Sequence, residues 1–108
     1  MSHSIILTSS EKLLLWRRRT KTPRNQIPPH TPWAIGEMER GQRKVAEDLK
    51  KLTGDITPTH AERCYIMRRR CRKTMDQVGK EIGKTKQWVW LVETGKIGCD
   101  ELLWYWEQ

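Results

Sequence analysis

The chain has 108 residues and a formal net charge of +8, because 21 lysines and arginines stand against 13 acidic residues. This length is enough for one domain or two very small ones, and the basic excess favours an acidic partner such as nucleic acid, although an ordinary solvated surface would have the same composition. The apolar runs are far too short to span a membrane, the N-terminus shows no secretory signal, and three cysteines without dense spacing suit a reducing cytosol better than a disulfide scaffold.

Signals for helix ends divide the chain into short helices. Thr8 to Glu11 form a capping box ahead of an apolar run, and Thr31 and Thr57 each precede a proline suited to a first helical turn. Apolar residues recur three and four positions apart, and no long segment alternates with period two. The chain is therefore predicted to be all-α, with helices near 9–20, 32–40, 44–53, 58–72, 75–82, 86–94 and 100–107.

Two halves of the sequence resemble each other. "EKLLLWRRRTK" (11–21) aligns with "ERCYIMRRRCR" (62–72) at an offset of 51, and "TPWAIGEMERGQ" (31–42) aligns with "TKQWVWLVETGK" (85–96) at an offset of 54. The second offset carries Leu49 onto Leu103. One register with one gap covers most of both halves, which favours a tandem duplication of a small helical bundle. The predicted units are residues 1–54 and 55–108.

The second half contains two short helices separated by a glycine turn. Thr74 is placed to cap a helix through Ile82, Gly83 gives the turn, and Thr85 caps the next helix. At about 100° per residue, this last helix has two faces. The predicted inward face holds Thr85, Trp88, Val89 and Val92, and the predicted outward face holds Lys86, Gln87, Trp90, Leu91 and Thr94. The arrangement is a helix-turn-helix, whose second helix can enter the major groove of DNA.

The segment "TMDQVGKEIGKTKQWVWLVETGK" resembles the helix-turn-helix of the Cro and lambda-repressor superfamily, also called the xenobiotic-response-element family. The match has no gap and extends over about residues 61–107, with Cys64, Met67 and Arg68 on the pattern of the first helix. Met75 departs from it, because the family has glutamine there. The matching positions of the two-helix segment are Thr74, Val78, Gly79, Ile82, Gly83, Thr85, Val89, Val92, Glu93 and Gly95.

This resemblance implies which residues would meet DNA. Thr74 and Thr85 would approach phosphates. Base edges would face Lys86, Gln87, Trp90 and Leu91, because lysine favours guanine acceptors, glutamine suits adenine and an apolar tip can contact a thymine methyl. Sequence-neutral backbone contacts would come from Arg69, Arg70, Arg72 and Lys96. The resemblance also implies an ion pair between Arg68 and Glu93, and the duplication places Arg17 and Glu39 in the corresponding positions.

The first half keeps the predicted helix positions of the second half but carries different side chains on its outward face. Its predicted outward face has lost the amide donor and gained an acid, so it is a poor reader of bases; that face holds Pro32, Trp33, Gly36, Glu37 and Arg40. Pro28 and Pro29 interrupt the preceding helix. We interpret this half as a degenerate helix-turn-helix that is kept for packing or for a protein partner.

Other residue patterns carry weaker signals. His60, Cys64 and Cys71 share a helical face, but no fourth ligand is evident and buried cysteine is common, so neither a metal nor another cofactor is expected. The two triple-arginine runs suit solvated helix surface as well as phosphate contact. No pair of carboxylates and no nucleophile–base set stands out, so the chain is not expected to be an enzyme.

The sequence therefore predicts a DNA-binding transcriptional regulator from a bacterium, phage or plasmid, acting in the bacterial cytoplasm as a repressor. It would bind double-stranded DNA as a homodimer, with the helix around residues 104–106 or the first half at the interface. The alternative is a protein-interaction module, such as an antitoxin or an inhibitor of a host protein, with helix-turn-helix ancestry only.

Overall fold

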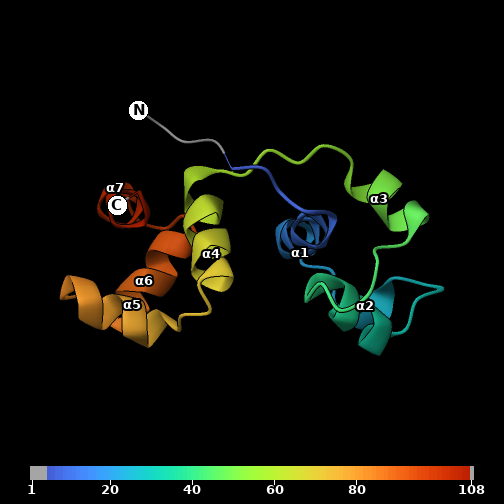
Figure 1. The fold of residues 1–108 in the computed structure, drawn as a ribbon, viewed down its shortest axis with the longest axis horizontal. Coiled ribbons are helices and arrows are strands. Elements are labelled where there is room, and N and C mark those ends of the chain that lie inside the picture. Colours follow the sequence, from blue (N-terminus) through green and yellow to red (C-terminus); the bar gives the residue numbers. More distant parts are fainter. Residues whose placement is uncertain (1–4, 108) are drawn as a thin grey trace. The chain divides into compact units, whose positions relative to one another are not determined.

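The computed structural model describes residues 5–107, and all regular structure among them is helical. The helices are α1 (Ser9–Thr20), the short 3₁₀ helix η1 (Arg24–Gln26), α2 (Pro32–Glu39), α3 (Glu47–Thr53), α4 (His60–Arg70), α5 (Met75–Ile82), α6 (Lys86–Glu93) and α7 (Asp100–Trp106) (Figure 1). The all-α prediction is confirmed, and each of the seven predicted helices is present. No helix in this range has the length and apolar character that a membrane span needs.

Several helix boundaries differ from the prediction. The helix expected from residue 58 begins at His60, because Thr59 and not Thr57 is its cap: the Thr59 hydroxyl accepts a hydrogen bond from the Glu62 amide at 3.2 Å, and the Glu62 carboxylate accepts from the Thr59 amide at 2.9 Å. The helix expected from residue 44 begins only at Glu47. The 3₁₀ helix η1 was not predicted.

The chain divides into two compact units. The N-terminal unit is Ile6–Thr57 and holds α1, η1, α2 and α3; the C-terminal unit runs from Pro58 onwards, includes Ile5, and holds α4 to α7. Each unit has its own apolar core. The N-terminal core is formed by Leu13, Ile27, Ile35, Met38, Val45 and Leu49, and the C-terminal core by Cys64, Val78, Val89, Val92 and Leu102.

The local backbone of the first unit recurs in the second. Both first helices begin with a threonine–glutamate capping box. Both are followed by a left-handed residue with φ of 55°, which is Lys21 after α1 and Arg72 after α4. The turns after α2 and α6 each contain a left-handed glycine, with φ of 75° at Gly41 and 78° at Gly95. These pairs stand at the sequence offsets of the two aligned halves, so the alignment describes a repeated structure as well as a repeated sequence.

A buried ion pair occupies the same position in both units, as predicted. In the C-terminal unit, Arg68 Nε lies 2.7 Å from Glu93 Oε2 and Arg68 Nη2 lies 3.0 Å from Oε1. In the N-terminal unit, the corresponding distances from Arg17 to Glu39 are 2.6 and 3.2 Å. The side chains of Glu39 and Glu93 are only 1% and 2% exposed. Each pair therefore ties the first helix of its unit to the end of α2 or α6.

The predicted register is wrong in the last helix of the repeat. The constant offset of 54 placed Leu49 opposite Leu103, but the residue that is fully buried in α7 is Leu102, and Leu103 is only partly covered. The helices α3 and α7 begin at Glu47 and Asp100. The connection after α6 is thus one residue shorter than the connection after α2, and the correspondence shifts by one residue beyond it.

The buried pair generates a prediction about stability. Replacing Glu93 by glutamine leaves the Arg68 guanidinium, which is largely buried, without its counter-charge, so Glu93→Gln should lower the free energy of unfolding by about 3–5 kcal/mol. The control is Glu101→Gln, because Glu101 is exposed and lies 3.7 Å from Lys84, and an exposed pair contributes little. Urea unfolding followed by circular dichroism measures both changes. Equal stability of the two variants would contradict a structural role for the pair.

Candidate nucleic-acid interface

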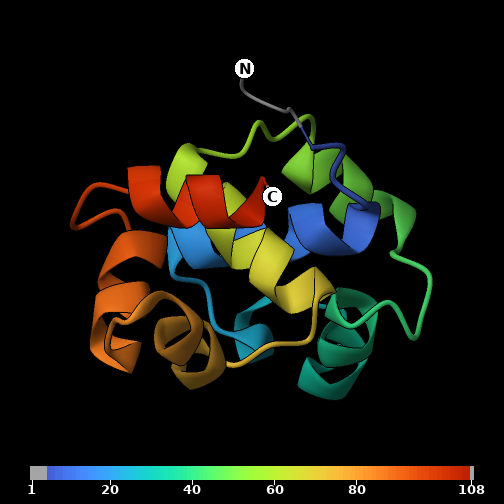
Figure 2. The same cartoon turned by 60° about the vertical axis from the view of Figure 1, so that its left-hand side comes forward.

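Two capped helices and a tight turn form the centre of the candidate site. The Thr74 hydroxyl accepts a hydrogen bond from the Gln77 amide at 3.1 Å, and the Gln77 side chain accepts from the Thr74 amide at 2.8 Å. The chain reverses at Gly83, which has φ of 71°. The Thr85 hydroxyl then accepts from the Trp88 amide at 3.0 Å. Figures 1 and 2 show α5 and α6 side by side, and they pack directly on each other.

The close approach of α5 and α6 depends on Gly79. A Cβ atom at this position would lie 2.7 Å from the carbonyl oxygen of Lys84, closer than real Cβ contacts come. The nearest atom is backbone and cannot move aside as the end of a flexible side chain would. Gly79 therefore lets the turn between the helices fold back against α5.

The two faces of α6 are largely as predicted. Val89 and Val92 are fully buried, and Trp88 is half-buried against the same core. Trp90 points outward and is 43% exposed. Thr85, which was predicted on the inward face, is instead an exposed cap. Among the predicted outward residues, Leu91 is half-buried, whereas Lys86, Gln87 and Thr94 are exposed.

Lysines lie beside both tryptophans of α6. Lys96 Nζ is 5.8 Å from the centroid of the Trp90 ring, so the structure brings these two predicted site residues together. Lys84 Nζ is 5.3 Å from the Trp88 ring and 3.7 Å from the carboxylate of Glu101. An ammonium group at such a distance is attracted by the aromatic ring. The outer surface of α6 therefore combines positive charge with an exposed aromatic ring.

The predicted backbone-contact arginines stand at the C-terminal end of α4, directly before α5. Arg69, Arg70 and Arg72 are all exposed. Arg69 lies over the ring of Tyr65 at 5.8 Å, and Arg72 holds the left-handed position that ends α4. Their positive charge at the end of a helix is also favourable for the helix dipole.

A polar cluster that sequence reasoning missed joins the loop before α5 to the helices α5 and α7 of the C-terminal unit. Lys73 Nζ lies 3.0 Å from both carboxylate oxygens of Glu81 and 3.0 Å from the Tyr105 hydroxyl, which also donates to Glu81. Hydrogen bonds with Tyr105 and Glu81 raise the pKa of Lys73, and hydrogen bonds from Tyr105 and Lys73 lower the pKa of Glu81. The cluster links α5 to α7. Lys73 lies outside any helix, and Glu81 and Tyr105 lie on different helices 24 residues apart, so no local pattern indicates these contacts.

The N-terminal unit has no equivalent of α5. Between α1 and α2 it has the three-residue helix η1, so the predicted interruption of this helix is confirmed. Trp33 is 66% exposed and stacks with the guanidinium of Arg43, which also pairs with Glu37 at 2.9 Å. Gly36 was predicted to face outward but is buried, because the guanidinium groups of Arg24 and Arg40 lie over it.

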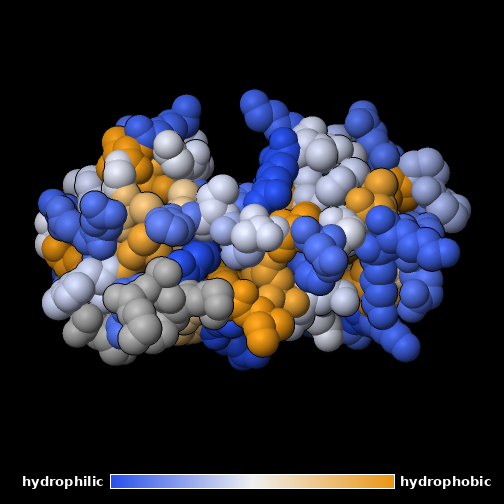
Figure 3. Space-filling model, turned by 90° about the horizontal axis from the view of Figure 1, so that it is seen from above, coloured by the Kyte–Doolittle hydropathy of each residue, from blue (hydrophilic) through white to orange (hydrophobic). Residues whose placement is uncertain are grey.

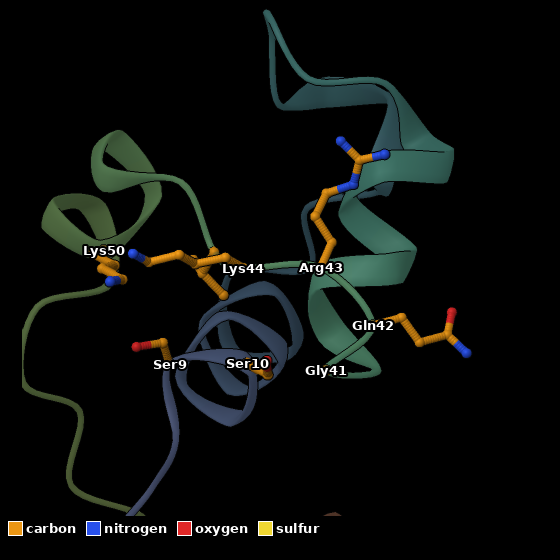
Figure 4. A pocket seen from close by; sticks show the side chains of 8 residues that line it. Ser9, Ser10, Gly41, Gln42, Arg43, Lys44 and Lys50 are labelled. Atoms are coloured by element: carbon orange, nitrogen blue, oxygen red, sulfur yellow. The ribbon is translucent and has the colours of Figure 1, made fainter.

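A hollow of about 280 Å³ lies in the N-terminal unit, next to the first turn of α1 (Figure 4). It is lined by Ser9, Ser10, Gly41, Gln42, Arg43, Lys44, Val45 and Lys50. Figure 4 shows that the side chains of Gln42 and Arg43 point away from α1. Lys50 pairs with Glu47 at 3.4 Å. The basic groups around this hollow are therefore divided, because Arg43 points away from α1 and Lys50 is paired with Glu47.

His60 and Cys64 of α4, and Cys71 just after it, are not gathered with further ligands. Within residues 5–107, no three side chains of histidine, cysteine, aspartate or glutamate lie together as a metal site needs. Cys64 is buried in the core, and this burial raises the pKa of its thiol to about 12. Cys71 is exposed.

No family model, no curated protein and no solved structure matches this chain.

The close contact at Gly79 predicts that an alanine substitution there lowers stability, whereas it usually raises it. Replacing a mid-helix glycine by alanine ordinarily stabilises a helix by about 0.5–1 kcal/mol. Gly79→Ala should instead destabilise the protein by about 1–3 kcal/mol, because the new methyl group forces α5 and the turn apart. Gly98→Ala is the control, since a Cβ there meets nothing within 4 Å. Thermal unfolding of the two variants tests the difference, and a Gly79→Ala protein as stable as the parent would refute the close contact.

Proposed function

We propose that this chain is a sequence-specific DNA-binding regulator of the Cro and lambda-repressor helix-turn-helix superfamily, with α5 and α6 as its helix-turn-helix. The observation that carries the proposal is a pair of capped helices. They are joined by a turn that packs closely on Gly79, and the second helix begins with exposed polar residues. The net charge of +8 supports it, because a basic surface is the electrostatic requirement for binding the phosphate backbone. In this role the protein acts by binding alone, without catalysis or a cofactor.

The start of α6 would read the bases. Lys86 and Gln87 occupy its first turn and are exposed. Lysine offers donors to guanine O6 and N7, and glutamine can pair with adenine N6 and N7. Trp90 lies one turn further along and offers an apolar edge to a thymine methyl, with Leu91 beside it. The unpaired amides at the helix start favour an approach to phosphate near Thr85, and those of α5 do the same near Thr74.

Sequence-neutral contacts would hold the protein on the duplex. Arg69, Arg70 and Arg72 before α5, and Lys96 after α6, stand on either side of the two-helix element in the chain and are exposed. Each phosphate that a cation neutralises releases condensed counterions, so affinity falls steeply as salt rises. Binding at an operator that overlaps a promoter would exclude polymerase, which makes repression in the cytoplasm of a bacterial cell the simplest outcome.

A homodimer is part of the proposal. One short recognition helix gives little affinity, and two-fold dimers of such units bind inverted half-sites about one helical turn apart. Trp104 is 65% exposed on α7, and tryptophan is enriched among the residues that dominate protein interfaces. Figure 3 shows one face of the molecule, on which apolar patches lie among hydrophilic side chains. The α7 surface or the N-terminal unit would supply the dimer contact.

A second candidate function is supported by the N-terminal unit. Trp33 is exposed, stacks with Arg43, and stands in a unit that lacks the first helix of a helix-turn-helix. Tryptophan and arginine are the residues that most often dominate protein–protein interfaces. This chain would then bind a protein, as an antitoxin or an inhibitor does. The salt dependence of duplex binding separates the two functions, because only DNA binding releases a large set of counterions.

The two helices α2 and α6 provide a matched comparison. Alanine in place of Lys86 and Gln87 should cost about 1–3 kcal/mol for each lost base contact and relax the preference at those base pairs. Alanine in place of Trp33 and Glu37 should leave duplex binding nearly intact, because α2 lacks donors for bases. Fluorescence anisotropy with a labelled duplex measures both. The reverse result, in variants that remain folded, would mean that the N-terminal unit reads DNA.

The sharpest test of the proposed function is selection of bound duplexes from a random pool, with an unrelated basic protein as the control for charge. Enriched sequences should share a short motif, present as an inverted repeat if the protein is a homodimer. Recovery of unselected sequences only, as for the control, would rule out sequence-specific regulation and leave the protein-interaction function.

A further inference from the structure

A hollow of about 170 Å³ lies between α4 and α7 in the C-terminal unit, apart from the exposed face of α6. Much of its wall is apolar and comes from both helices, together with the residue that precedes the N-terminal unit. This apolar part is formed by Ile5, Cys64, Met67 and Leu103. The volume is close to that of an engineered cavity of about 150 Å³ that holds a benzene molecule. The hollow is thus large enough for a small ring or a short branched chain, and too small for a peptide.

Two hydrogen-bond donors in this hollow have no partner. Arg63 is 8% exposed, and its Nε–H makes no hydrogen bond within residues 5–107. The indole Nε1–H of Trp106 is also buried and also unpartnered. Both residues line the hollow. An unpaired buried donor is costly, and most buried polar groups in folded proteins have a partner.

The charge and polarity of these groups define what would satisfy them. Both are donors, so the missing group is an acceptor, and the fixed positive charge of Arg63 favours an anion. Burial raises the pKa of the neighbouring Cys64 thiol to about 12, so this thiol stays uncharged at neutral pH and does not repel an anion. The carboxylate of Glu107 also borders the hollow, but Glu107 is exposed to solvent, which weakens its effect.

We propose that this hollow binds a small monocarboxylate with an aromatic or short branched apolar body. The carboxylate accepts hydrogen bonds from Arg63 Nε–H and Trp106 Nε1–H, and the apolar body packs on Met67 and Leu103. Arginine and carboxylate form the strong, charge-assisted type of hydrogen bond. The site is separate from the proposed DNA-reading face, so it stands or falls independently of that function.

Benzoate is a suitable probe, because it combines a carboxylate with one ring. Titration of the full-length ¹⁵N-labelled protein should move the Trp106 indole N–H and Arg63 Nε–H resonances in a saturable way, with a dissociation constant of about 0.1–1 mM for so small a ligand. The Trp106 resonance is identified by its loss in Trp106→Phe. Aniline is the control ligand, because it has the same ring size and an amino group in place of the acceptor.

Substitutions in the hollow distinguish benzoate binding at this site from non-specific binding elsewhere on the protein. Trp106→Phe keeps an aromatic ring and removes one donor, and Arg63→Met keeps a long apolar stem and removes the other. Each should weaken benzoate binding about 10- to 100-fold, because a hydrogen bond to a charged group is lost. Glu101→Gln, in the same helix but outside the hollow, should bind as the parent does. Circular dichroism confirms that each variant is folded.

Three results would overturn the proposal. Benzoate would produce no saturable shift at Trp106, or aniline would bind as tightly as benzoate, or both Trp106→Phe and Arg63→Met would keep the parent affinity while folded.

Discussion

The buried pair between Arg68 and Glu93 is the constraint on which the C-terminal unit depends. Burying a lone carboxylate costs several kcal/mol, so Glu93, at the end of α6, is stable in the core only where a guanidinium meets it. Two parallel hydrogen bonds fix orientation as well as distance. The pair therefore fixes the rotation of α6 about its own axis against α4, and with it the face that Lys86 and Gln87 present to solvent. Arg68 also donates to the Lys73 carbonyl at 3.1 Å, which ties the end of α4 to the start of the two-helix element.

The N-terminal unit keeps this constraint and changes what surrounds it. Arg17 holds Glu39 in the same bidentate way, and Arg24 from η1 adds a third bond to Glu39 at 3.1 Å. Prolines follow η1 and prevent a helix equivalent to α5. The shared ion pair with a different second element fits a duplication whose two copies diverged between their first and third helices.

The sequence predicted those features that depend on local or periodic signals. Capping residues and apolar spacing located all seven α-helices, and the repeat located the Arg17–Glu39 pair before any contact was known. The outward position of Trp90 followed from helical geometry alone. Three of the errors have a common cause, because they concern packing between segments. The burial of Gly36, the shift that places Leu102 in the core and the cluster around Lys73 all depend on chain regions that meet only in the folded unit. The cap at Thr59 depends on local sequence. The glutamate three residues after Thr59 completes a capping box, and this signal distinguishes Thr59 from Thr57.

The proposal that the start of α6 meets DNA can be tested directly, because nuclear magnetic resonance locates a binding surface residue by residue. A duplex recovered by selection would be added to the ¹⁵N-labelled protein at physiological salt, and backbone amide shifts would be followed residue by residue. The account predicts the largest changes at Lys86, Gln87 and Trp90, with smaller changes at Arg69 and Lys96 and little change along α2. Changes centred on α2, with the amides at the start of α6 unmoved, would contradict it.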